Sequence, residues 1–325
     1  MFLTLKPSNL DEGMMARIQA IRGLLADTKT VSVKLHGKTY EVEYLIIPPM
    51  SEKGRSLISV FNYPGGLTHL GPCIEPFVYL DRESIHISPL GYGKSSDLPS
   101  SVWKTDPLHG AEVSLQALRA LGKKQIILYA HSNGAPVVLE AALRAHELGI
   151  EVRGIDLINP LGLRRLPMIW AMFAHPVSGA LSKIQSWFYR HPYDYLKDAY
   201  RKTKHPFSLR KLLYELDKSS KRRLPAQLQE IGRQEIPLRV VLSKGDWGSF
   251  HWPWTKSNEE IIRDNFPEKF LEILSLKGLH NVTLGKDSET LSIILGKSFL
   301  MSLSLAVLFF PYFPVLPACI LGRIG

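Results

Sequence analysis

Ser132 lies in the stretch AHSNGA, directly after the strongly apolar run QIILY. A serine acts as a nucleophile when a sharp strand-to-helix bend holds its Oγ clear of the backbone and beside a base. Small residues two positions before and after the serine let the helix cross close to the strand, and Ala130 and Gly134 meet this requirement. The same spacing occurs in ordinary turns, so the surrounding sequence must distinguish a nucleophile from a turn serine.

Two further residues complete a candidate set. Asp246 follows the apolar stretch LRVVLSKG, and His280 lies in LKGLHNVTL, after the next apolar stretch. In this order the aspartate orients the imidazole, while the histidine takes the serine proton and returns it to the leaving group. Plainer roles stay open, because Asp246 could begin an Asx-turn and His280 could be an ordinary loop histidine. A rival acid, Asp156, is less suitable because it lies within the preceding predicted strand rather than after it.

The elements that must position these residues alternate between strands and helices. Thr30–Ile47 alternates apolar and polar residues around HGK, which predicts a hairpin of half-buried strands. This alternation predicts an α/β fold with a mostly parallel sheet and helices on both faces. Further strands are predicted over 56–62, 84–88, 123–130, 152–160, 238–246 and 269–280, and helices over 111–121 and 134–149.

Residues 160–235 interrupt this alternation with helical, basic and aromatic segments that show no strand pattern. We interpret them as a helical cap inserted into the sheet domain. The predicted organisation is therefore a core in two parts, 1–159 and 236–300, with the cap between them and an apolar tail over 301–325.

The length and charge of the chain limit its domain organisation and the classes of partner that it could bind. A chain of 325 residues suits one large α/β domain with an insertion, or two smaller domains. The net charge of +10 is uneven, because residues 160–235 hold 15 Lys and Arg against 6 Asp and Glu, a balance of +9. Such a segment could attract anionic lipid or acidic substrates, or could be a solvated helical face. Nucleic acid is disfavoured as a partner because no basic–aromatic platform or recognised binding motif is present.

The sequence contains no pattern that indicates a metal site, a cofactor site or a disulfide framework. No His, Cys, Asp and Glu grouping has metal-ligand spacing, so we expect neither a metal nor a cofactor. The two cysteines, Cys73 and Cys319, imply no disulfide framework. Because the first residues also lack the pattern of a signal peptide, we expect a cytoplasmic location.

The C-terminal tail raises the question of a membrane. Ser298 to Gly322 runs for 25 residues without a charge, which is long enough to cross a bilayer. Pro311, Pro314 and Pro317 interrupt helix hydrogen bonding in its second half. Membrane contact through this tail and the basic insertion is therefore one hypothesis, and an extension of the last helix is the other.

Four motifs together resemble the α/β-hydrolase fold superfamily, over about Val31 to Leu300. FNYPG at 61–65 resembles its His-Gly-x-Pro-Gly oxyanion loop, and SPLGYGKSS at 88–96 resembles its Asp-x-x-Gly-x-Gly-x-Ser turn. AHSNG is the nucleophile elbow, and SKGD with GLHN supplies the acid and the base. The chain departs from the pattern at Phe61 and Asn62, which replace His-Gly, and at Ser88, which replaces the aspartate.

The resemblance implies an activity and an oxyanion site. It implies that the backbone N–H groups of Tyr63 and Asn133 stabilise the oxyanion, and that Ser132, Asp246 and His280 form the catalytic triad. A serine at the elbow argues against the dehalogenase and epoxide-hydrolase branches, which use an aspartate there. We expect a carboxylester hydrolase acting on a small-molecule or lipid-like acyl substrate. The alternatives are a non-catalytic ligand-binding protein, favoured by the changes at 61 and 62, and an acyltransferase or amidase using the same triad.

Overall fold

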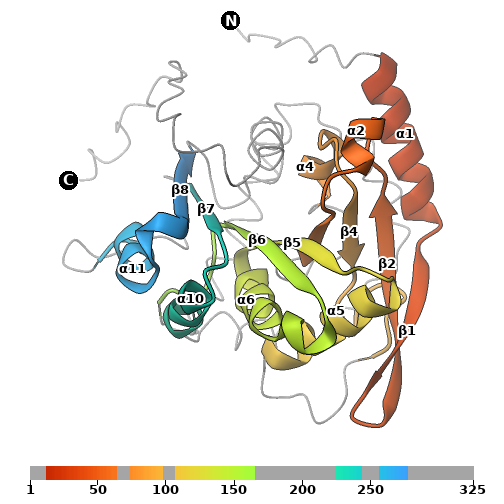
Figure 1. The fold of residues 1–325 in the computed structure, drawn as a ribbon. Coiled ribbons are helices and arrows are strands. Elements are labelled where there is room, and N and C mark those ends of the chain that lie inside the picture. Colours follow the sequence, from red (N-terminus) through yellow and green to blue (C-terminus); the bar gives the residue numbers. More distant parts are fainter. Residues whose placement is uncertain (1–11, 64–73, 98–106, 165–223, 244–255, 277–325) are drawn as a thin grey trace, which may run out of the picture.

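The computed structural model describes residues 12–63, 74–97, 107–164, 224–243 and 256–276 (Figure 1). They contain one eight-stranded sheet in the order β1-β2-β4-β3-β5-β6-β7-β8. The strands are β1 (Lys29–Leu35), β2 (Lys38–Ile47), β3 (Val60–Tyr63), β4 (Ser84–Ile87), β5 (Gln125–His131), β6 (Glu151–Ile158), β7 (Leu238–Ser243) and β8 (Leu271–Leu276). The helices are α1 (Glu12–Ala26), α2 (Glu52–Arg55), α4 (Glu75–Val78), α5 (Pro107–Ala120), α6 (Ala135–Arg144), α10 (Leu224–Arg233) and α11 (Asn258–Asn265), with short 3₁₀ turns η1 (Ser132–Gly134), η2 (Ala145–Leu148) and η4 (Glu268–Phe270).

The sheet is mostly parallel, as predicted. β4, β3, β5, β6, β7 and β8 pair in parallel, whereas β2 pairs antiparallel with both β1 and β4. The predicted N-terminal hairpin is confirmed, and its two-residue turn has His36 at φ 48° and Gly37 at φ 76°. Positive φ at both positions matches the twist of a tight hairpin turn. The carboxyl ends of the parallel strands lie along one edge, and this edge must carry any site built from their loops.

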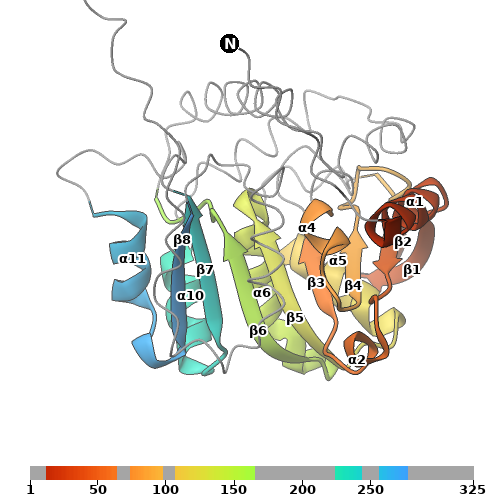
Figure 2. The same cartoon turned by 90° about the horizontal axis from the view of Figure 1, so that it is seen from above.

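Helices cover both faces of the sheet (Figures 1 and 2). One face packs against α1 and α4, and the other packs against α5, α6, α10 and α11. Because both faces are covered, central strands such as β3 and β4 are buried at every position rather than at every second one. α1 was not predicted from the sequence, although Ile18, Ile21 and Leu25 follow helical spacing and are buried in the core.

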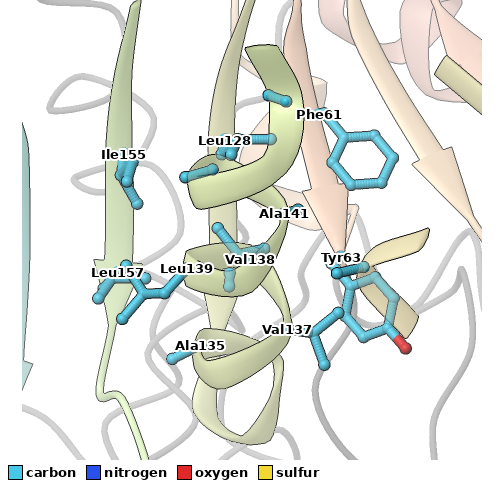
Figure 3. Close-up of a cluster of buried hydrophobic side chains, with 14 of the residues drawn as sticks. Phe61, Tyr63, Leu128, Ala135, Val137, Val138, Leu139, Ala141, Ile155 and Leu157 are labelled. Atoms are coloured by element: carbon cyan, nitrogen blue, oxygen red, sulfur yellow. The ribbon is translucent and has the colours of Figure 1, made fainter. Parts of the chain in front are cut away.

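The core beneath α6 fixes the helix that follows Ser132. Apolar side chains of α6 pack on side chains of β3, β5 and β6 that point to the same face of the sheet (Figure 3). The Tyr63 ring lies beside Val137 of α6 (Figure 3). At about 1.5–3 kcal/mol for each large buried side chain, this packing holds the direction of the helix against a local strain at its start.

One row of polar residues crosses the other face at mid-strand. Its members are register neighbours on successive strands, and all are buried except Glu272, whose side chain is 22% exposed. Because register neighbours on parallel strands point to the same side, the row forms one continuous line. We call it the polar row, and it consists of His86, Asn62, Tyr129, Asp156, Arg239 and Glu272.

The described residues include only the two ends of the predicted insertion and none of the predicted tail. The final segment of the insertion, α10, packs its buried Leu224, Leu228 and Ile231 into the core beside α6. Residues 165–223, which hold most of the predicted cap, and the tail over 301–325 lie outside the described residues. Within the described ranges, none of the helices has the length and apolar content needed to cross a bilayer.

Candidate active site

Ser132 occupies a strained position at a sharp bend. It follows β5, begins the turn η1 and precedes α6, and its φ of 55° lies in the left-handed region. For a residue with a Cβ atom this conformation costs about 1–2 kcal/mol, so ordinary turns place glycine there. Ser132 is 4% exposed and its backbone carbonyl accepts hydrogen bonds from the N–H groups of Ala135 and Leu161. The predicted strand-to-helix elbow is therefore present, with the serine at its apex.

The two small residues around Ser132 are required by close packing. A Cβ atom at Gly134 would lie 2.7 Å from the backbone oxygen of Tyr63 and 3.3 Å from the Cβ of Ala130. A backbone oxygen at the end of a central strand cannot move aside cheaply. A larger residue at position 134 would therefore push α6 away from β3 and β5, and a larger residue at 130 would do the same.

The two predicted oxyanion donors lie beside this bend. Tyr63 ends β3 and is the register partner of Ala130, two residues before the serine. Asn133 is buried and directly follows Ser132, in the first turn of the helical segment that leads into α6. The partial positive charge at a helix N-terminus favours a negative oxygen at this place. We predict that the N–H groups of these two residues converge on one point. This geometry also depends on residues 64–73, which lie outside the described residues.

Asp246 and His280 also lie outside the described residues, but the strands that lead to them are present. β7 ends three residues before Asp246, and β8 ends four residues before His280. Both strands run parallel to β5, so they end at the same edge as Ser132. The strands that precede the three predicted triad residues therefore end at one edge of the sheet, and the arrangement of the triad itself remains a prediction.

A contact that the sequence analysis missed links β6 to β7 at this edge. Asn159 directly follows β6, is 1% exposed and has a φ of 43°. Its Oδ1 accepts the backbone N–H of Ser243 at 2.8 Å, and its Nδ2 donates to the Ser243 Oγ at 2.9 Å. The dipeptide Asn159–Pro160 was a usable signal, because Asn-Pro favours the start of a turn directly after a strand.

The turn after β4 departs from the family pattern in a way that the structure explains. The carboxylate of Glu43 on β2 accepts the Ser88 hydroxyl at 2.7 Å, the Thr28 hydroxyl at 2.5 Å and the Lys94 backbone N–H at 3.1 Å. Gly93 leaves room for it, since a Cβ there would lie 1.8 Å from the carboxylate oxygen. Glu43 therefore supplies from the neighbouring strand the carboxylate that the pattern places at position 88. Sequence alternation on β2 predicts a half-exposed glutamate, and the structure buries it completely.

The departures at Phe61 and Asn62 also have structural partners. Phe61 is fully buried in the core beneath α5 and α6, where Figure 3 shows its ring. Asn62 points to the opposite face, with its Nδ2 2.9 Å from Nδ1 of His86. The other ring nitrogen of His86 lies 2.9 Å from the Ser84 Oγ, and burial lowers the pKa of this imidazole to about 3. His86 is therefore neutral at physiological pH, and its ring nitrogens contact buried polar groups within the sheet.

The rival acid Asp156 belongs to the polar row. It lies in the middle of β6, 3.4 Å from the guanidinium of Arg239, whose Nε donates to Glu272 at 2.8 Å. Burial raises the pKa of Asp156 to about 6, against the opposing effect of Arg239 and Arg82. Its register partner Tyr129 precedes Ser132 by three residues, which is about 10 Å along a strand. Asp156 is thus placed and paired as an interior residue, in agreement with the sequence analysis.

Comparisons with known proteins identify the fold. No protein-family model matches the chain, and no curated protein matches it by sequence. Among solved structures, an α/β-hydrolase enzyme from a Medee basin deep-sea metagenome library is 12% identical with a TM-score of 0.56, over 86% of this chain and all of that one. An enol-lactonase from Burkholderia xenovorans is 13% identical with a TM-score of 0.57, over 82% of this chain and 98% of that one.

A third similar structure is a bacterial membrane phospholipase A. It is 16% identical with a TM-score of 0.57, over 90% of this chain and 93% of that one. At these identities the likeness is one of fold. It agrees with the strand order, the helix layers and the bend at Ser132. The chain therefore has the α/β-hydrolase fold that its motifs predict.

Proposed function

We propose that the protein is a serine hydrolase that cleaves an ester-type bond through an acyl-enzyme on Ser132. The observation that carries the proposal is the left-handed backbone of Ser132 at the β5–α6 bend. A serine is an unfavourable choice for this conformation, and strain of this kind is retained where function requires it. Gly134 and Ala130 then provide the close packing that the sharp bend at the nucleophile needs.

The mechanism follows from the roles of the proposed residues. His280 takes the proton of the Ser132 hydroxyl as its Oγ attacks the carbonyl carbon, and Asp246 stabilises the charged imidazole. The N–H groups of Tyr63 and Asn133 donate to the resulting oxyanion. His280 then protonates the leaving alcohol, and a water molecule activated by the same histidine releases the acid and restores Ser132. No metal or cofactor enters these steps.

Carboxylesters are the substrate class that we favour. Two structures with the same fold are named for enzymes of ester bonds, an enol-lactonase and a membrane phospholipase A. The apolar tail and the aromatic segments of the predicted cap favour a lipid-like acyl group. Contact of the basic insertion and this tail with anionic membranes is part of the same proposal, tested by flotation with anionic and neutral vesicles with and without residues 298–325.

A p-nitrophenyl ester series from acetate to palmitate tests the activity. Wild-type protein is expected to release a burst of nitrophenolate equal to the enzyme concentration, followed by slower turnover, because the acyl-enzyme accumulates. Ser132→Ala is expected to give neither phase. The same rate in both proteins at every chain length would overturn the proposal. Added alcohol that diverts the acyl group would identify an acyltransferase.

A non-catalytic binding protein is the weaker alternative. Its support came from the changes at positions 61 and 62, and both residues now have packing roles of their own. Strain at Ser132 has no evident purpose in a binding module. We therefore place the hydrolase first.

A further inference from the structure

We propose that Asn159 is a positioning residue that fixes the carboxyl end of β7 relative to the nucleophile elbow, and with it the start of the segment leading to Asp246. The inference rests on the proposed hydrolase function. It adds a residue that neither the motifs nor the chain order of the triad indicates.

The register places Asn159 between the two parts that it would connect. His131 on β5 pairs with Ile158 on β6, and Ile158 pairs with Val241 on β7. The next residue along each strand is Ser132, Asn159 and Leu242, respectively. Asn159 therefore lies level with the nucleophile, directly after the end of β6, the strand between β5 and β7.

Three hydrogen bonds connect Asn159 to β7. Its backbone N–H donates to the Val241 carbonyl at 2.8 Å, and its amide bonds both the backbone N–H and the hydroxyl of Ser243. All three groups belong to the last three residues of β7, and Ser243 is only 3% exposed. Water cannot easily replace a bond lost here, because the groups are buried.

The segment that begins at Asn159 is also hydrogen-bonded to the nucleophile elbow. Leu161, two residues after Asn159, donates its backbone N–H to the carbonyl of Ser132 at 3.2 Å. The segment from 159 to 161 is thus bonded to the nucleophile residue on one side and to the end of β7 on the other. A displacement of the acid by about 1 Å relative to the nucleophile is enough to slow catalysis strongly.

The left-handed backbone of Asn159 makes a clean variant available. Asparagine is one of the few residues that tolerate a φ of 43°, and glycine tolerates it better. Asn159→Gly therefore removes both side-chain bonds without adding strain. Asn159→Asp keeps an oxygen for the Ser243 N–H and a second oxygen for its hydroxyl. Asn265→Gly, at the end of α11, is a matched asparagine change away from this edge.

The experiment measures the rate of Ser132 labelling by a fluorophosphonate between pH 4 and 9 in the full-length protein, with folding checked by thermal melting. We expect the plateau rate of Asn159→Gly to fall by about 10- to 100-fold. The midpoint of its acid limb should move down by about one pH unit, because a displaced carboxylate stabilises the imidazolium less. Asn159→Asp is expected to recover most of the rate, and Asn265→Gly to match wild type.

The outcomes separate this inference from the proposed function. An unlabelled wild type overturns both. A labelled wild type with the same midpoint and plateau in folded Asn159→Gly overturns the positioning role alone, since a purely structural residue would lower only the melting temperature. If Asn159→Gly does not fold, Ser243→Ala decides, because it removes the hydroxyl partner only. A downward shift of its midpoint supports the inference, and an unchanged midpoint contradicts it.

Discussion

The elbow and the polar row place buried polar residues on the same strands and use them in opposite ways. In the polar row, Asp156, Arg239 and Glu272 lie within regular strands, and neighbouring charges compensate one another. At the carboxyl edge, Ser132 lies on a left-handed backbone that its residue type disfavours. The row carries charged residues, whereas the edge residues Ser132, Asn159 and Ser243 are buried to a similar degree but uncharged.

In this protein backbone strain, rather than a shifted pKa, marks the candidate catalytic residue. A strongly shifted pKa alone would point to Asp156 or His86, and both face the interior of the sheet. Backbone strain at the end of a strand, beside positions that only small residues can occupy, points to Ser132 instead. The row therefore should control stability and the elbow should control activity, and mutations can test that division.

Ser132→Ala should give the largest effect, a loss of ester hydrolysis of at least about 10³-fold, because the nucleophile is removed. Its free energy of unfolding should stay near that of wild type. Ser132→Gly should be equally inactive but more stable than Ser132→Ala by about 1 kcal/mol, since glycine accepts the left-handed conformation. Steady-state kinetics and urea unfolding of both variants measure this. Equal stability of the two would mean that the bend stores no strain.

Arg239→Met should lower the free energy of unfolding and leave the activity of the folded protein unchanged. It leaves Asp156 buried without its nearest cation, and breaking a buried pair in this way costs about 3–5 kcal/mol. Activity per folded molecule should stay close to wild type. Arg233→Met, on the exposed side of α10, is the matched control and should cost under about 1 kcal/mol. Loss of activity in folded Arg239→Met would contradict the expectation that the polar row controls stability and the elbow controls activity.

Asp156→Asn should change the pH dependence of unfolding. The folded pKa is about 6 against an ordinary 3.8, so the folded state binds more protons between these values. The contribution of Asp156 is therefore fully present below about pH 4 and lost as the pH rises through 6. The stability of the variant relative to wild type should rise by about 3 kcal/mol from pH 4 to pH 8. A relative stability that falls with pH would mean that the two arginines outweigh burial.

Gly134→Ala should affect both stability and activity. The added Cβ meets the Tyr63 carbonyl oxygen at 2.7 Å, and overpacking of this kind costs about 1–3 kcal/mol. Displacement of α6 should also slow fluorophosphonate labelling. Gly23→Ala in α1 is the control, since no atom lies within 4 Å of its added Cβ and helix propensity should make it stabilising. A stable and fully reactive Gly134→Ala would show that the close approach is dispensable.

The sequence allowed much of this architecture to be predicted. Hydrophobic periodicity predicted the hairpin, the parallel strands and the helix after Ser132, because a covered sheet needs apolar strands and a bend needs small residues. The elbow could be predicted because its requirements fall within five consecutive residues.

Contacts between distant residues could not be predicted in the same way. Glu43 accepts a hydrogen bond from Ser88, 45 residues later in the chain, and Asn159 bonds Ser243 across 84 residues. Such contacts depend on strand register, which the pattern of one strand does not specify. The polar row was missed for the same reason, since each member appears in sequence as a single polar residue inside an apolar strand.

Labelling with a fluorophosphonate, with the adduct located by peptide mass, tests whether Ser132 is an activated nucleophile. Wild type and His280→Ala are compared, with His146→Ala on the exposed turn η2 as the matched histidine control. We expect rapid stoichiometric addition to Ser132 in wild type and His146→Ala, and a loss or strong slowing in His280→Ala. Folded wild-type protein that forms no adduct, or an adduct at another residue, would contradict the claim that Ser132 is an activated nucleophile.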